Sequence, residues 1–137
     1  MKYISKEATK VMDVLTELAN MNDGHIKIDN RPGSFMAVVV EKLHDLDNGP
    51  VFSVSHYYEQ NGDLMSDPDI TFLKITTPVM NFYYPLTYRQ DNLGIDRELV
   101  TYDESGKKIK GFYKKLQADT AAFCTLWMRN IKNQQKL

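Results

Sequence analysis

The side chains best able to do chemistry gather in one polar stretch near the middle of the chain. Residues 56–69 read HYYEQNGDLMSDPD and combine an imidazole, two phenol rings, carboxamides and carboxylates. A second polar stretch, residues 88–94 with the sequence YRQDNLG, ends a segment rich in aromatic residues. If the two stretches lie on neighbouring strands, their side chains face each other across a sheet. We therefore expect one binding surface made of His56, Tyr58, Gln60, Asn61, Asp63, Tyr88, Gln90 and Asp91.

Catalysis and metal binding are the alternatives for the same stretch. His56 beside Glu59 or Asp91 would be an oriented imidazole able to act as a base, and the candidate nucleophiles are Ser53, Ser55 and Ser66. Asp63, Asp67 and Asp69 carry hard oxygen ligands suited to Ca²⁺ or Mg²⁺, but their spacing is not that of an EF-hand. No glycine-flanked serine turn, phosphate loop or HExxH pair is present. The sequence favours a binding module without a cofactor over a small, divalent-metal-dependent hydrolase.

Charge is divided unevenly along the chain, although the formal net charge is only −1. Residues 41–106 carry four Lys/Arg and twelve Asp/Glu, whereas residues 107–137 carry eight and one. The two explanations are attraction between an acidic sheet and a basic closing helix, and a basic surface that meets an acidic or nucleic-acid partner. Lysines pair with phosphates and rings stack on bases, so single-stranded DNA contact would use Lys107, Lys108, Lys110, Phe112, Tyr113, Lys114 and Lys115. A solvated helix face has a similar composition.

Length and composition bound the class of protein. The chain has 137 residues, of which 42% are hydrophobic and 26% charged, values typical of one globular domain. The one cysteine, Cys124, lies among apolar residues, where a thiol is normally buried and inert. No apolar run resembles a signal peptide or approaches the ~18–20 residues of a membrane span. We expect a single cytoplasmic domain over residues 1–137 that makes no membrane contact.

Hydrophobic periodicity predicts a helix near each end of the chain. From about residue 5 to 21, apolar residues recur at helical spacing, with Ser5 as the N-cap and Gly24 just beyond the end. From about residue 111 to 136, large apolar residues again fall near helical spacing, namely Phe112, Leu116, Phe123, Trp127 and Ile131. Each apolar stripe requires a surface to pack against.

The segment between the helices, about residues 25–102, has the pattern of strands. The run 36–40 is apolar on both faces, which is typical of a central strand. Asn61-Gly62 predicts a tight hairpin turn, because both residues tolerate positive φ, and residues 66–69 read as a loop. The patterns together predict an α+β fold, in which a curved antiparallel sheet of five or six strands packs with the two helices and leaves its other face open.

The two polar stretches also carry a resemblance. The phrase HYYEQNGDLM, the Asp67-Pro68 pair and the stretch YRQDNLG resemble an uncharacterised bacterial domain family carried by plasmids, phages and conjugative elements. The resemblance covers roughly residues 35–100 and implies no activity. Longer relatives hold the domain beside antirestriction-type or single-strand DNA-binding segments. The resemblance therefore implies an accessory protein of a mobile element. Its partner would be a protein or a nucleic acid.

Overall fold

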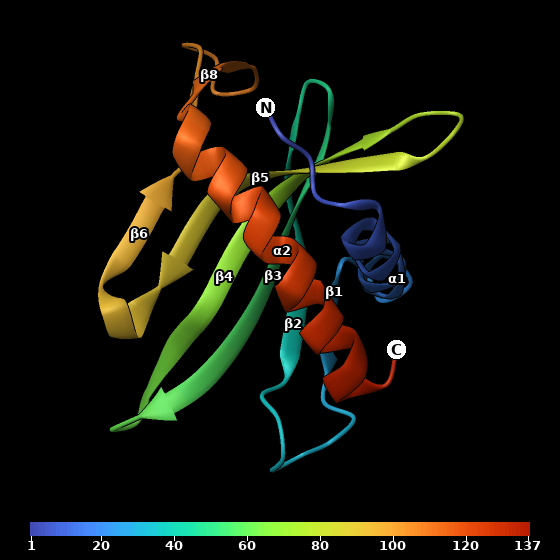
Figure 1. Cartoon of the computed structure of the whole chain (residues 1–137), viewed down its shortest axis with the longest axis vertical. Helices are drawn as coiled ribbons and strands as arrows, with labels where there is room; N and C mark the ends of the chain where they lie inside the picture. Colours follow the sequence, from blue (N-terminus) through green and yellow to red (C-terminus); the bar gives the residue numbers. More distant parts are fainter.

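The computed structural model describes all 137 residues and contains two helices, a large sheet and a small one (Figure 1). The helices are α1 (Lys6–Asn20) and α2 (Lys114–Gln135). The six strands of the antiparallel sheet lie side by side in chain order: β1 (His25–Ile28), β2 (Val38–Leu46), β3 (Gly49–Gln60), β4 (Asp63–Thr76), β5 (Asn81–Gln90) and β6 (Ile95–Glu98). The remaining elements are the 3₁₀ turn η1 (Asp91–Leu93) and the paired strands β7 (Val100–Tyr102) and β8 (Ile109–Phe112). The predicted α+β class is confirmed.

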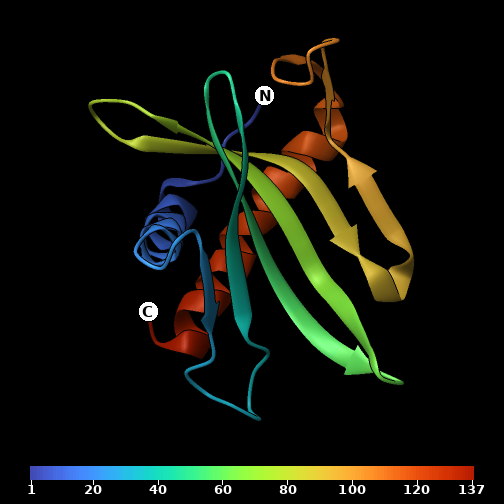
Figure 2. The same cartoon turned by 180° about the vertical axis from the view of Figure 1, so that it is seen from behind.

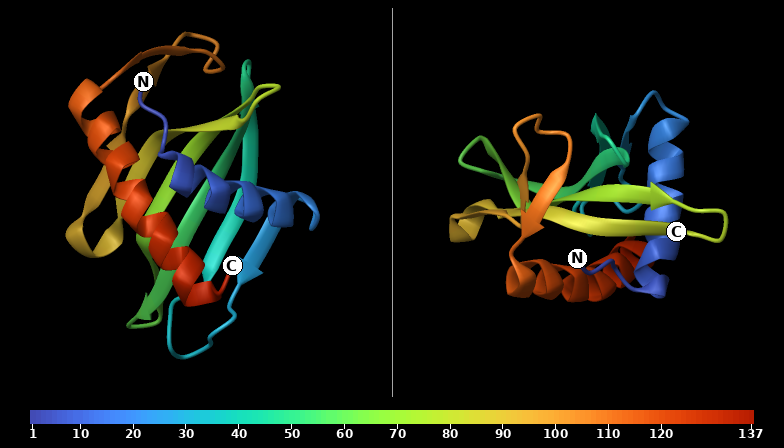
Figure 3. Two further views of the ribbon diagram at one scale, coloured as in Figure 1. Left: turned by 45° about the vertical axis from the view of Figure 1, so that its right-hand side comes forward. Right: turned by 90° about the horizontal axis from the view of Figure 1, so that it is seen from above.

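Both helices lie on the same face of the large sheet, and α2 runs diagonally across it (Figure 3). The apolar stripe of α1 is buried there, and the first turn of the helix is capped as expected: the Ala8 amide donates to Ser5 Oγ at 3.2 Å. The main core of 18 buried residues joins both helices to the inner face of the sheet. One face of the sheet is thus buried under the two helices.

The opposite face carries no helix (Figure 2). Its register aligns one polar residue from each strand in a row across the sheet, His25, Glu41, Ser53, Thr71, Thr87 and Glu98. One end of this face is covered by β7 and β8 (Figure 3), which pack over a second, smaller core of Leu46, Val51, Leu73, Leu86 and Val100.

The C-terminal helix begins three residues after the expected position 111. Residues 109–112 form β8 instead, and the Tyr113 amide donates to the Leu99 carbonyl at 2.9 Å. Gly111 permits this pairing, because a Cβ there would lie only 3.1 Å from Thr101 Oγ1. The expected last part of the sheet is also divided, since the chain leaves β6 at the buried Leu99 and enters the two-stranded sheet.

The turn of the β3–β4 hairpin is as predicted, but the part of the hairpin next to the main sheet is not. Asn61 and Gly62 have φ values of 54° and 84°, which confirms the tight turn. Residues 66–69, expected to form a loop, instead lie within β4. The register shifts here, so that Asp67 and Pro68 lie opposite the single residue His56.

Candidate functional site

At the base of the β3–β4 hairpin, a chain of hydrogen bonds joins β4 to β5. Tyr88 Oη donates to Gln90 Oε1 at 2.7 Å, and Gln90 Nε2 donates to Asp67 Oδ1 at 3.0 Å. Burial raises the pKa of Tyr88, and the nearby Asp67 carboxylate raises it further. The Tyr88 hydroxyl therefore stays protonated and serves as a donor.

Asp91 closes the same region from the end of β5. Its carboxylate accepts the Ser66 amide at 2.7 Å and Arg89 Nε at 2.8 Å. These bonds, with the Ser66 amide foremost, lower the pKa of Asp91. The carboxylate is thus committed to holding the irregular part of β4 in place.

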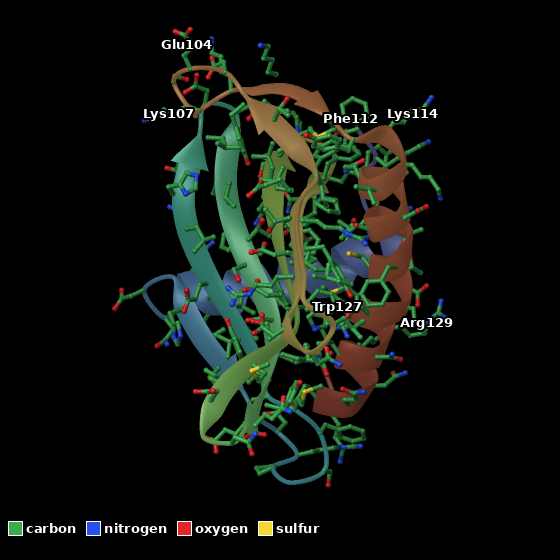
Figure 4. The ribbon with its side chains drawn as sticks, turned by 90° about the vertical axis from the view of Figure 1, so that its left-hand side faces the viewer. Glu104, Lys107, Phe112, Lys114, Trp127 and Arg129 are labelled. Carbon is green, nitrogen blue, oxygen red and sulfur yellow. The ribbon has the colours of Figure 1, made fainter.

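His56 faces the helices, where it is buried with only 5% of its surface exposed. Its ring lies edge-on to Trp127 of α2, with centroids 5.8 Å apart, and Trp127 projects from the helix toward the sheet (Figure 4). His56 Nε2 and Trp127 Nε1 are both buried without a hydrogen-bond partner. Burial lowers the pKa of His56, against the opposing effect of Asp67. The imidazole is held neutral in a largely apolar contact. We call the hydrogen-bonded group Asp67, Tyr88, Gln90 and Asp91 the tied cluster, and His56 lies beside it with Nε2 unpartnered.

The other four residues of the expected binding surface lie elsewhere. Tyr58, Gln60, Asn61 and Asp63 belong to the far part of the β3–β4 hairpin, which extends beyond the rest of the sheet (Figure 2). Gln60, Asn61 and Asp63 are exposed. The structure therefore links His56, Tyr88 and Gln90 through Asp67, holds Asp91 on the adjacent Ser66, and leaves the hairpin tip apart from them.

Of the carboxylates named for the alternative hydrolase, only Asp67 lies near His56. Asp69 lies on the helix-free face, where it accepts a hydrogen bond from Ser53 Oγ at 2.8 Å, whereas His56 lies on the helix-covered face. Burial raises the pKa of Asp69. Asp63 sits at the hairpin tip and Asp67 is engaged by Gln90. No three His, Cys, Asp or Glu side chains of the chain are placed to share a metal ion.

The basic segment forms a second candidate surface at the opposite end of the sheet. Strand alternation turns Lys110 and Phe112 outward while Ile109 packs on the smaller core. Phe112 and Tyr113, adjacent in sequence, are 44% and 51% exposed. Figure 4 shows Lys107, Phe112 and Lys114 at this end of the molecule. We call this group the basic–aromatic surface: Lys107, Lys108, Lys110, Phe112, Tyr113, Lys114 and Lys115.

The cations of the basic–aromatic surface are only partly neutralised. Lys108 lies 4.0 Å from Asp47, and Lys115 pairs with Asp119 of its own helix at 3.0 Å. Lys107, Lys110 and Lys114 take part in no ion pair. On α2 the basic residue paired with another element is Arg129, which binds Glu7 of α1. Lys107, Lys110 and Lys114 make no ion pair with the acidic residues of the sheet. Attraction within the molecule therefore does not account for these three cations.

The sequence did not indicate that the N-terminal segment joins this surface. The side chain of Gln117, fully buried, accepts the Lys2 amide and donates to the Lys2 carbonyl, each at 2.7 Å. This places Lys2 beside the first turn of α2. The contact spans 115 positions in sequence, so no local pattern could have predicted it.

Most of the chain matches a known family. Residues 9–137 match the family described as a domain of unknown function, DUF6908. The chain belongs to this family. No curated protein and no solved structure matches the DUF6908 chain. Neither of its helices combines the length and apolar composition needed to cross a bilayer.

Proposed function

We propose that this protein is a non-enzymatic binding module that holds single-stranded nucleic acid on the basic–aromatic surface. One observation carries the proposal: the short segment of residues 107–114 contains three lysines without ion pairs, Lys107, Lys110 and Lys114, and two exposed rings, Phe112 and Tyr113. Lysines supply phosphate contacts, and rings accept any base by stacking.

The shape of the surface supports the same partner. A hollow of about 610 Å³ beside β8 is lined in part by Lys108, Lys110 and Phe112, and also by Asp47, which pairs with Lys108. It offers space for a base next to the Phe112 ring, while Lys110 reaches a backbone phosphate and Lys108 exchanges Asp47 for another. Sequence-independent binding follows, because nothing in this arrangement depends on base-edge hydrogen bonds.

The resemblance of the two polar stretches to a domain family of mobile elements indicates where this activity would take place. An accessory protein of a plasmid, phage or conjugative element would act inside the cell, where such elements expose single-stranded DNA. The rival hydrolase requires His56 to work with Asp63, Asp67 and Asp69. Asp67 lies near His56 but is bonded to Gln90, and the positions of Asp63 on the hairpin tip and Asp69 on the helix-free face do not favour such a site.

The test is the salt dependence of binding to a fluorescent oligo-dT. If all five lysines neutralise one phosphate each, log K falls against log salt with a slope of about −3.5. The double variant Lys110→Ala/Lys114→Ala should reduce that slope by about 1.4, since each phosphate on a single strand contributes about 0.7. Lys10→Ala/Lys132→Ala changes the net charge equally on the outer helix surface and should leave the slope unchanged.

Two results would overturn the proposal. One is an absence of oligo-dT binding by the unaltered protein at low salt. The other is equal affinity for polyglutamate and oligo-dT of matched charge, which would mean that the surface recognises an acidic protein without base stacking.

A further inference from the structure

The outer surface between the two helices holds a groove that is separate from both regions above. It has a volume of about 410 Å³ and lies between the first half of α1 and the last turns of α2. Its lining consists of Lys6, Glu7, Lys10, Val11, Val14, Arg129, Lys132 and Leu137. The volume falls within the range of small-molecule sites.

The floor of the groove is apolar and its rim is basic. Val11, Val14 and Leu137 supply the floor, and Val14 is 42% exposed. Long basic side chains cover such surfaces with their methylene stems and keep the charged ends at the rim. An occupant would therefore meet an apolar strip edged by ammonium groups.

The charge of the rim is unbalanced even after its internal ion pair is formed. Glu7 binds Arg129 through both carboxylate oxygens, at 2.7 and 2.8 Å. This carboxylate is bonded to Arg129 and also interacts with the charge of Lys132, and Lys6 and Lys10 take part in no ion pair, so the four cations still outnumber the one carboxylate. Figure 4 shows Arg129 on the side of α2 that faces away from the sheet.

We propose that this groove binds a small anionic amphiphile, a ligand with a carboxylate or sulfonate head and an apolar body. The body lies on the valine and leucine floor, and the head pairs with Lys10 and Lys132. The inference is independent of the nucleic-acid proposal, because the groove shares no residue with the basic–aromatic surface.

The experiment uses decanoate and decyltrimethylammonium as probes below their micelle concentrations, with binding measured by calorimetry. The full chain should bind decanoate with one-to-one saturation, and the cationic probe at least about tenfold more weakly. Lys10→Glu/Lys132→Glu should reverse this preference. The reversal counts only with one-to-one saturation by the cationic probe and an unchanged circular dichroism spectrum, because an unfolded acidic chain binds such a probe at many sites.

A second pair of variants tests the apolar floor. Val14→Asp should weaken decanoate binding about tenfold, which corresponds to about 1.4 kcal/mol. Leu126→Asp is the matched control, since Leu126 is 53% exposed on α2 and does not line the groove. Equal binding of the two probes, an absence of saturation, or equal losses in the two aspartate variants would overturn the proposal.

Discussion

The tied cluster and the basic–aromatic surface differ in how their polar groups are used. In the tied cluster, Tyr88, Gln90 and Asp91 bind one another or the backbone of β4. On the basic–aromatic surface, three lysines have no ion pair and two neighbouring rings are half exposed. Polar groups that satisfy each other stabilise a fold, whereas those left unsatisfied at the surface remain available to a partner. A polar, aromatic-rich sequence does not distinguish the two cases.

The strongest test of this comparison is removal of the tryptophan that contacts His56 beside the tied cluster. Trp127 is 4% exposed, stacks on Phe123 and contacts His56. Trp127→Ala should reduce the free energy of unfolding by about 3–5 kcal/mol, the usual cost of deleting a buried Trp side chain. Urea unfolding followed by circular dichroism measures the change. Leu126→Ala, at the exposed neighbouring position, should change stability by less than about 0.5 kcal/mol; similar losses in both would contradict the assigned packing.

The second test removes a ring from the basic–aromatic surface. Phe112→Ala should weaken oligo-dT binding by about 1–3 kcal/mol, because stacking on one base is lost. Binding of an abasic oligomer of the same length should not change. Fluorescence anisotropy with both oligomers separates stacking from charge. An equal loss with the two oligomers would show that Phe112 does not stack on a base.

The third test removes one hydrogen bond from the tied cluster. Tyr88→Phe deletes the donor to Gln90 and should lower the free energy of unfolding by roughly 0.5–1.5 kcal/mol. Its affinity for oligo-dT should equal that of the unaltered protein. A loss of affinity with unchanged stability would reverse the roles assigned to the two regions.

The smallest expected effect is a pH dependence of stability from His56. Burial lowers its folded-state pKa below the ordinary value of 6.5, so the unfolded chain binds the proton more readily. The contribution of His56 to stability is then fully present above that ordinary value and declines as the pH falls below it, toward the folded pKa. His56→Phe should remove this part of the decline in urea titrations across that range. Parallel pH profiles for the two proteins would show that His56 is not buried as a neutral ring.

The local features of the fold could be predicted because neighbouring residues determine them. The Ser5 cap and the Asn61-Gly62 turn each depend on a few adjacent positions. The strand β8 was missed because it has only four residues, two of them Lys110 and Gly111, and it gains its pairing from β7. A short strand of this kind has no periodicity long enough to detect.

The candidate sites were less predictable because they depend on register and on distant contacts. The Gln90–Asp67 bond requires β4 to be irregular opposite His56, and the Ser66–Asp69 stretch gave no sign of a strand. The same irregularity of β4 separates the tied cluster, at the base of the β3–β4 hairpin, from the residues at the hairpin tip. The lysines of the second surface were visible in the sequence, but their lack of ion pairs was not.

The most direct test of the account is a titration of the ¹⁵N-labelled protein with oligo-dT, followed by amide chemical shifts. The largest changes should fall on residues 107–115 and on Lys2, with little change at Tyr88, Gln90 and the hairpin residues 58–63. A map centred on the β3–β4 hairpin or on the helix-free face, with residues 107–115 unaffected, would contradict the assignment of the binding surface.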